Sequence, residues 1–405
     1  MRSLKRLFRI LLEVQGVFVV GAQIFEDLDE VEILVRRRKD AQPRCPECHK
    51  GLGGKIVSHR VRWRHWDILD WKCYLAGEVR EGWCPRHGRR VEQVPWATPA
   101  ARHTKAFDRK VARMVQMADK TAVTELYRVS WRTVGRIVRR VVDAELPKDL
   151  YKDLDAIGVD EVSYKRGHRY LTVVSDLITS RVVWVGEGKS AETLTKFFQE
   201  LGGERARRLS AVAMDMSEAY RTVVAEWAPQ AQIVYDRFHV VKLLLDAVDE
   251  LRREECRKVQ GPAREALKKT RFALLRNPKH RTPRDLEAIQ RVEKGNRRLA
   301  RGYGLRVDFE ELWMIENVAD ARVFLMRWTR AALRSRLSPL CRFARTVREH
   351  LDGILGFFRY YGTTNAVLEG TNNKIKLLIH RAYGFRSVPA LLAMIHLCCS
   401  GINLS

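Results

Sequence analysis

The sequence contains no stretch of about eighteen consecutive apolar residues free of charge, so it predicts no transmembrane helix. The apolar run near the first residue is broken by Arg9, Glu13 and Gln15, and we therefore expect no secretory signal. Internal repeats and low-complexity segments are also missing. These absences favour a cytoplasmic protein with no membrane partner, in which the eight cysteines stay reduced and serve metal binding rather than disulfides.

Acidic residues are far fewer than basic residues in this chain. There are 49 Asp and Glu residues against 75 Lys and Arg residues, which gives a formal net charge of +26 at pH 7. Unbalanced cations repel one another and attract phosphate, so nucleic acid is the expected partner, and a basic protein without such a role is the alternative. The length of 405 residues and the hydrophobic content of 46% allow two or three domains, each with a buried core.

Four potential metal ligands occur in residues 1–97 as two pairs with the same spacing. Cys45 and Cys48 form a C-x-x-C pair, and Cys84 and His87 repeat this spacing in C-P-R-H. Two such short loops can place four ligands tetrahedrally around Zn²⁺, each loop supplying two. The other cysteines and histidines nearby do not repeat the paired spacing: Cys73, His49, His59 and His65. The intervening segment alternates like two strands, so we expect a zinc ribbon with a structural Zn²⁺.

Residues 98–148 are predicted to form a helix-turn-helix domain. Apolar residues recur at helical spacing in residues 102–118, and Ser130 is placed to cap a later basic helix. This later helix carries arginines that we expect to be exposed and to contact DNA in the major groove. These arginines are Arg132, Arg136, Arg139 and Arg140. A basic helix that is merely solvated is the alternative for any single one of them.

Strands and helices alternate in residues 149–240. Three strand-like segments with short connections predict an antiparallel meander, and a helix, a strand, a helix and a last strand follow them. No glycine-rich turn follows the first strand, which argues against a dinucleotide-binding fold. The order indicates a ribonuclease-H-like catalytic core, and the predicted fold class is therefore a multidomain α/β protein.

A long helical region separates this core from the C-terminal segment. Residues 251–301 contain seventeen Lys or Arg residues and six acidic residues, with apolar residues at helical spacing. We expect an all-α insertion over residues 241–355 and a return of the chain to the catalytic core over residues 356–405. The insertion is either a surface that clamps DNA or a purely structural helical domain.

Three carboxylates that could bind metal ions lie in different predicted strands and helices. Asp160 and Asp215 each close a short apolar run, so we expect them at the ends of the first and fourth strands, and Glu369 lies in a helix-like stretch. Two divalent ions held by carboxylates can activate an attacking hydroxyl and stabilise the leaving oxygen in phosphodiester cleavage. Mg²⁺, or Mn²⁺, prefers such oxygen ligands, so the three acids predict a metal-dependent enzyme that cuts and joins DNA. Glu161 and Asp176 are rival acids nearby.

Several longer motifs resemble those of a known family. They are CPEC from residue 45, CPRHG from residue 84, VPWA at 94–97, VDE at 159–161, DRFHVVKL from residue 236 and TTNAVLEGTNNKIK followed by GFRS. With these motifs the chain resembles the ISL-three family of bacterial insertion-sequence transposases, part of the DDE group. The resemblance implies a transposase that binds the terminal inverted repeats of its element, nicks the ends and transfers strands to target DNA. It also implies that Asp160, Asp215 and Glu369 bind the metal ions.

The residues around Glu369 have helical spacing to it. Asn365, Asn372 and Lys376 lie four, three and seven residues away, so they share or adjoin its helical face. We expect Lys376 to contact DNA phosphate and the two asparagines to orient the site or the DNA.

Asp236 and His239 follow the last predicted strand, close to the same edge of the sheet. They could assist the site as a spare ligand and a proton carrier, and the alternative is a histidine that only stabilises the corner between strand and helix. Processing of two DNA ends predicts at least a homodimer on DNA. Two other classes remain open: a zinc-bearing transcription regulator without catalysis, and a ribonuclease-H-like nuclease specific for DNA structure.

Overall fold

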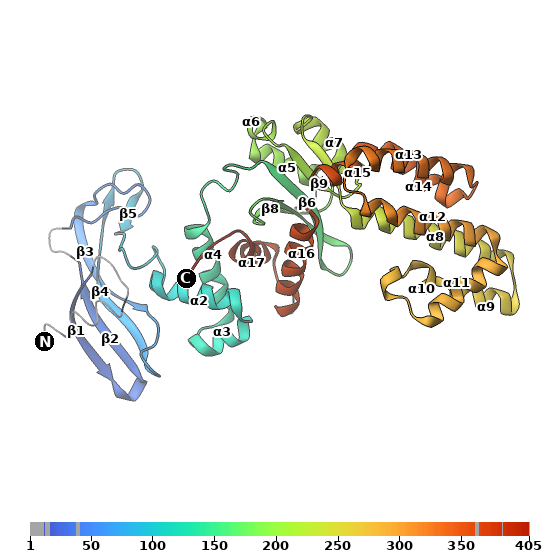
Figure 1. Ribbon diagram of the computed structural model, residues 1–405. Coiled ribbons are helices and arrows are strands. Elements are labelled where there is room, and N and C mark those ends of the chain that lie inside the picture. The colour runs from blue at the N-terminus through green and yellow to red at the C-terminus, as the bar shows by residue number, and fades with distance from the viewer. Residues whose placement is uncertain (1–11, 13–16, 38–40, 361–363, 383, 405) are drawn as a thin grey trace. The chain divides into compact units, whose positions relative to one another are not determined.

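The computed structural model describes residues 12, 17–37, 41–360, 364–382 and 384–404, with only the backbone of residues 364–366. The chain divides into two compact units, drawn as ribbons in Figure 1. One unit consists of Met1–Lys148 and Leu377–Ser405, and the other of Asp149–Lys376. Helix α16 (Thr364–Arg381) crosses this division, so the C-terminal segment that we expected in the catalytic core contributes to both units.

The first unit begins with a five-stranded sheet. Its strands are β1 (Phe18–Phe25), β2 (Glu30–Arg36), β3 (Gly53–Arg64), β4 (Lys72–Cys84) and β5 (Gly88–Val91). The order is β1-β2-β4-β3, with β5 paired to β4, and only β2 and β4 run parallel. Ile33, Trp63 and Leu75 are central to its core. The two strands predicted between the ligand pairs are confirmed as β3 and β4, whereas β1 and β2 were not predicted.

Three helices with capped N-termini follow the sheet. They are α2 (Lys105–Met117), α3 (Lys120–Tyr127) and α4 (Trp131–Glu145). The side chains of Thr104 and Asp119 cap α2 and α3, and the Ser130 hydroxyl accepts the backbone N–H of Thr133 at 3.2 Å. These hydrogen bonds satisfy N–H groups that have no partner inside the helix, and they confirm Ser130 as the predicted cap.

Residues from the C-terminal end of the chain complete this helical group. Helix α17 (Val388–Cys399) packs against α4 and α2. The side-chain amide of Gln116 on α2 donates to the backbone oxygens of Leu397 at 2.7 Å and Ile402 at 3.1 Å. Arg381, at the end of α16, donates to the backbone oxygen of Val115 at 2.8 Å. The helix-turn-helix region therefore depends on contacts with residues more than 260 positions away.

The second unit is built on another five-stranded sheet. Its strands are β6 (Ala156–Lys165), β7 (Arg169–Asp176), β8 (Val182–Glu187), β9 (Ala211–Met214) and β10 (Gln232–Tyr235). The order is β10-β9-β6-β7-β8. β6, β7 and β8 form an antiparallel meander, as predicted, and β9 and β10 run parallel to β6. Between these strands lie α5 (Ala191–Leu201), α6 (Gly203–Ala206) and α7 (Glu218–Trp227).

A long helical segment connects β10 to α16. Its α-helices are α8 (Arg237–Lys258), α9 (Gly261–Lys269), α10 (Arg271–Leu275), α11 (Pro283–Gly295), α12 (Arg297–Glu310), α13 (Val318–Arg334), α14 (Ser338–Glu349) and α15 (Leu351–Arg359). Figure 1 shows α8 alongside α12, and α13 alongside α14. Helix α15 returns to the sheet at β10, where a Cβ atom on Gly356 would lie 2.6 Å from the backbone oxygen of Ile233. One continuous hydrophobic core extends from the sheet into these helices.

Candidate active site and metal centre

Asp160 lies within a strand rather than at its end. β6 continues to Lys165, so the prediction that Asp160 closes the first strand is wrong. The pairing of β6 with β9 ends at Gly158, however, and Asp160 is therefore just beyond the end of the neighbouring strand. Its Oδ1 accepts the backbone N–H of Glu161 at 2.6 Å, and its Oδ2 accepts a hydrogen bond from Nδ2 of Asn372.

Asp215 and Asp236 follow two parallel neighbouring strands. β9 ends at Met214 and β10 at Tyr235, and these two residues are partners in the register, so both aspartates leave the sheet at the same edge. Asp215 is thus placed as predicted, and Asp236 caps α8 by accepting the backbone N–H of Phe238 at 2.8 Å.

His239 links these two aspartates. Its Nδ1 contacts Oδ1 of Asp215, and its Nε2 lies 4.0 Å from Oδ2 of Asp236. The buried Oδ1 of Asp215 has no hydrogen bond of good geometry, so the contact with His239 is an ion pair without a well-directed hydrogen bond. This carboxylate oxygen is therefore shielded from water and occupied by the imidazole of His239.

Burial and crowding of negative charge perturb the pKa values of this cluster. Burial raises the pKa of Asp160, and the nearby Asp215 raises it further, against the lowering effect of the Glu161 N–H. Burial also raises the pKa of Asp236. For His239, burial opposes the charged form, but the contact with Asp215 and the field of the aspartates outweigh it, and the pKa is raised. A concentration of carboxylates that resist ionisation is a typical setting for a divalent cation.

Glu369 reaches the same end of the sheet from helix α16. The preceding residue, Leu368, is buried against Ala213 and Val234. A Cβ atom on Gly158 would lie 2.4 Å from the Leu368 side chain, so only glycine allows α16 to approach β6 this closely. Glu369 itself is exposed, and its charge contributes to the raised pKa of Asp236.

The three predicted metal ligands do not converge on one point in the described parts of the chain. Asp160, Asp215 and Glu369 are absent from the groups of three or more ligand atoms within 4.8 Å of one another that these parts contain. The donor set nevertheless fits Mg²⁺ or Mn²⁺, because it consists of carboxylate oxygens, one of them buried without a hydrogen bond. Lys376 is exposed on the same helix, and the side chain of Asn365 lies outside the described residues.

The four predicted zinc ligands do converge. Their ligand atoms all lie within 4.8 Å of one another: Cys45, Cys48, Cys84 and His87. The Sγ atoms of Cys48 and Cys84 are 3.5 Å apart, and Nδ1 of His87 lies 3.5 Å from Sγ of Cys45. Zn–S bonds of about 2.3 Å in a tetrahedron imply edges of roughly 3.8 Å, so the cluster fits Zn²⁺.

The rival ligands are engaged elsewhere. His49, His59 and His65 are hydrogen-bonded to Gln93 at 3.0 Å, Glu81 at 3.0 Å and Thr104 at 2.8 Å, respectively. Cys73 is buried in the core of the first sheet, where burial raises the pKa of its thiol to about 12. For Cys84, burial raises the pKa, but the backbone N–H groups of Arg86 and His87 lower it to a net value of about 7. Cys84 is therefore poised to become the thiolate that zinc requires.

The arginines of α4 differ in their surroundings. Arg132, Arg136 and Arg139 are exposed, as predicted. Arg140 is not free: its side chain is 22% exposed, and its guanidinium donates two hydrogen bonds of 2.9 Å to the buried carboxylate of Asp108 on α2. The expected exposure is thus wrong for Arg140, because this arginine neutralises a carboxylate of the neighbouring helix.

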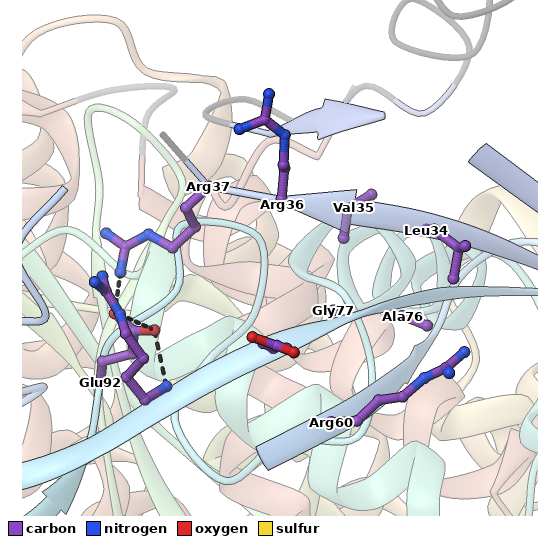
Figure 2. A pocket seen from close by; sticks show the side chains of 10 residues that line it. Leu34, Val35, Arg36, Arg37, Arg60, Ala76, Gly77 and Glu92 are labelled. Carbon is purple, nitrogen blue, oxygen red and sulfur yellow. Dashed lines mark hydrogen bonds and ion pairs between the residues drawn. The ribbon is translucent and has the colours of Figure 1, made fainter. Parts of the chain in front are cut away.

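A pocket that the sequence did not indicate opens between β2 and β4. It has a volume of about 400 Å³, and its lining includes four arginines: Arg36, Arg37, Arg60 and Arg80. Arg37 and Arg80 are both ion-paired to Glu92. Figure 2 shows Arg37 beside Glu92 and the guanidinium of Arg60 lying apart from them. Arg37 and Arg80 share Glu92, and Arg60 is ion-paired to Glu32, so three of the four guanidinium groups are bound to buried glutamates. We interpret this arrangement as an ion-pair network that links strands of the first sheet.

Comparison with known proteins agrees with this geometry. Residues 157–395 match a family described as transposase, and residues 92–142 match the helix-turn-helix domain of transposase family ISL3. The chain belongs to the ISL3 family of transposases. The transposase for insertion sequence element IS1557 of Mycobacterium tuberculosis is 36% identical over 98% of this chain and 96% of its own length. The transposase for insertion sequence element IS1001 of Bordetella parapertussis is 32% identical over 85% and 84% of the two chains.

This membership confirms the prediction of a DDE-type transposase. The transposase and helix-turn-helix regions of this ISL3-family member imply DNA as a partner and a divalent metal ion as a cofactor. None of the described helices is long and apolar enough to cross a membrane.

Proposed function

We propose that this ISL3-family transposase binds the terminal inverted repeats of its insertion sequence and cleaves and transfers DNA strands with Mg²⁺ or Mn²⁺. In this proposal Asp160, Asp215 and Glu369 hold the metal ions. The observation that carries it is the hydrogen bond from Asn372 to Asp160, because it joins the helix of Glu369 to the central strand of the sheet. Proteins related to this chain carry names of bacterial insertion-sequence transposases, which supports a role on bacterial chromosomal DNA in the cytoplasm.

Each residue of the site has a proposed task. Bound divalent ions would supply Lewis-acid activation of the phosphodiester and of the attacking hydroxyl. Asp160 and Asp215 provide oxygen ligands from neighbouring strands, and Asn372 orients Asp160. His239 holds the carboxylate of Asp215 through Nδ1, and its second nitrogen, Nε2, is available to carry a proton on the side of Asp236.

We propose a ribonuclease-H-like core for the second unit. The strand order β10-β9-β6-β7-β8, with an antiparallel meander and two added parallel strands, supports this assignment. The helices from α8 to α15 are then an insertion between the strand that precedes Asp236 and the helix of Glu369. Their shared hydrophobic core with the sheet favours a structural contribution of the insertion in addition to any contact with DNA.

We propose that Cys45, Cys48, Cys84 and His87 bind a structural Zn²⁺ in a zinc ribbon. All four protein ligands are present, which leaves no open position for substrate. Two further sets of residues would contact DNA. The exposed arginines of α4 would read or position the terminal repeat, and Lys376 with Asn365 would contact the strand at the active site.

Amide substitution of one carboxylate tests the catalytic proposal. Asp160→Asn should bind an end duplex as the wild type does but lose nicking in Mg²⁺, whereas Asp155→Asn should remain active, since Asp155 is exposed near the start of the same strand. Unchanged cleavage by Asp160→Asn would refute the site. Binding without any metal-dependent cleavage by the wild type would favour a regulator, and cleavage without joining of 3′ ends into a second duplex would favour a nuclease.

We also propose that at least two copies act together on paired DNA ends. Mass photometry with and without the end duplex measures the number of chains directly. A dimer is expected in the presence of DNA, and a complex with one chain on paired ends would contradict the proposal.

A further inference from the structure

In the sequence, Phe238 lies between Asp236 and His239, two residues of the proposed active site. It is the second residue of α8, flanked closely by Asp236 and His239. Despite this central position, 66% of the Phe238 surface is exposed. An exposed aromatic ring contributes nothing to the core of the protein, so its place at a catalytic edge requires another explanation.

Local contacts orient the Phe238 ring. The backbone N–H of Phe238 donates to the Asp236 side chain at 2.8 Å, which holds the first turn of α8. The ring meets the imidazole of His239 edge to face, with centroids 5.4 Å apart and planes at 82°. The ring is therefore held against the residue that contacts Asp215, while most of its surface remains open.

Positive charge accompanies this ring along α8. Lys242 follows Phe238 by one helical turn and is exposed, so the two side chains are neighbours on one helical face. Arg237 is also exposed, and its guanidinium lies 5.2 Å from the centre of the Trp313 ring. An aromatic face beside a cation matches one nucleotide unit, because bases stack on aromatic rings and phosphates bind ammonium groups.

We propose that Phe238 stacks on a nucleobase next to the scissile phosphate and that Lys242 contacts a phosphate of the same strand. The ligand is a base that has left its stack in the duplex end, since a base inside an intact duplex offers no free face to the ring. This inference rests on the proposed function, because it places the scissile phosphate at Asp160 and Asp215. It adds a substrate-positioning role for a residue that binds no metal.

Photocrosslinking tests the contact without requiring catalysis. The probe is an end duplex, taken from the DNA that flanks the gene, with 5-iodouracil placed in turn at each position around the cleavage site. Asp160→Asn protein is irradiated with this duplex, and the crosslinked peptide is identified by mass spectrometry. The expected crosslink maps to Phe238, with the probe base next to the scissile phosphate. Crosslinks at every probe position that all exclude Phe238 would overturn the proposal.

Matched variants measure the functional effect. Phe238→Ala should lower the cleavage rate roughly five- to hundredfold, in line with the loss of one stacked base, and Phe238→Trp should retain most of the rate. Phe272→Ala is the control, since Phe272 is also 66% exposed but belongs to α10 of the helical insertion. An abasic nucleotide at the crosslinking position should reduce the difference in cleavage rate between Phe238→Ala and the wild type, because the ring then has no base to stack on.

The outcomes separate this inference from the proposed function. Suppose that the wild type cleaves DNA and Asp160→Asn does not. If the cleavage rates of Phe238→Ala and Phe272→Ala are then equal, the stacking proposal is wrong and the catalytic proposal stands. If Asp160→Asn still cleaves, the proposed site itself is wrong. Phe238→Ala could also lose activity to the same extent on abasic DNA, while Phe238→Trp fails to restore the activity. This result would contradict stacking and indicate a packing role.

Discussion

The side-chain amide of Asn372 donates a hydrogen bond to Asp160 across 212 residues of sequence. Asn372 is buried and lies one turn of α16 after Glu369, whereas Asp160 lies on the central strand β6. One donor thus connects the Asp160 carboxylate to α16, the helix that carries Glu369, the third acid of the proposed site. Residues that hold a metal ligand in this way commonly affect activity almost as strongly as the ligand itself.

Loss of this hydrogen bond should weaken the metal site. We predict that Asn372→Ala lowers the cleavage rate about ten- to hundredfold and raises the Mg²⁺ concentration needed for half-maximal activity. Asn373→Ala is a matched control, because Asn373 is the next residue of the same helix and is exposed. Cleavage assays over a Mg²⁺ series check the prediction, and equal curves for the two variants would contradict it.

The exposed and the ion-paired arginines of α4 should respond differently to substitution. Arg136→Ala should weaken binding of the end duplex with little effect on stability, because Arg136 is exposed. Arg140→Ala should lower the free energy of unfolding by roughly 2–3 kcal/mol, because it leaves the buried Asp108 without its charged hydrogen-bond donor. Fluorescence anisotropy and urea unfolding measure the two effects. A stable Arg140→Ala protein with a large binding defect would reverse this assignment.

Much of the second unit could be predicted from the sequence. Strands β6 to β10 each contain a short apolar run, and Ser190 and Ser217 stand at the cap positions of α5 and α7. Hydrophobic periodicity carries this information locally. β1 was not predicted, although FVVGAQIF is also a mostly apolar run, and in the folded chain six of its eight residues are exposed.

Contacts between distant residues were the part that the sequence did not reveal. The spacing of Arg140 on α4 suggested an exposed side chain, and only the packing of α2 brings Asp108 to it. The association of Leu377–Ser405 with the first unit likewise depends on tertiary contacts. For the proposed site, the choice of Asp160, Asp215 and Glu369 from the motifs stays a prediction. The hydrogen bond of Asn372 and the exposure of Phe238 follow only from the folded chain.

Removal of one proposed zinc ligand should disrupt the metal centre. We expect the purified wild type to contain one zinc ion per chain and Cys45→Ser to lose it, with a lower unfolding temperature, because ligand binding stabilises a small metal domain. Cys341→Ser should keep its zinc, since Cys341 lies on α14, outside the cluster. Elemental analysis by mass spectrometry measures the zinc content of each variant. Full zinc in Cys45→Ser would exclude Cys45 as a ligand.

His65 should make the first unit less stable in acid. Burial, then the charges of Lys110 and Arg64, lower the pKa of His65 to about 3, against an ordinary value near 6.5. Between these values the unfolded chain binds a proton that the folded chain excludes. Stability is therefore complete above about pH 6.5 and falls with decreasing pH, at up to about 1.4 kcal/mol per pH unit.

The variant His65→Asn should remove this dependence. Urea unfolding at several values between pH 7 and pH 5 should show a smaller loss of stability for His65→Asn than for the wild type. His59→Asn is the control, because His59 is exposed and its ring pairs with Glu81. Parallel curves for the wild type and His65→Asn would show that His65 titrates normally in the folded chain.

Gln116 should be required for the stability of the helix-turn-helix region. Its amide donates to the backbone oxygens of Leu397 and Ile402, and Gln116→Ala would remove these two hydrogen bonds between α2 and the C-terminal residues. We predict a loss of about 1–3 kcal/mol in unfolding free energy and faster hydrogen exchange in α17. Met117→Ala, a change at the adjacent 62% exposed residue, should leave both quantities close to those of the wild type. If hydrogen exchange in α17 is equally slow in both variants, packing against α4 and α2 holds α17, and the amide of Gln116 contributes little.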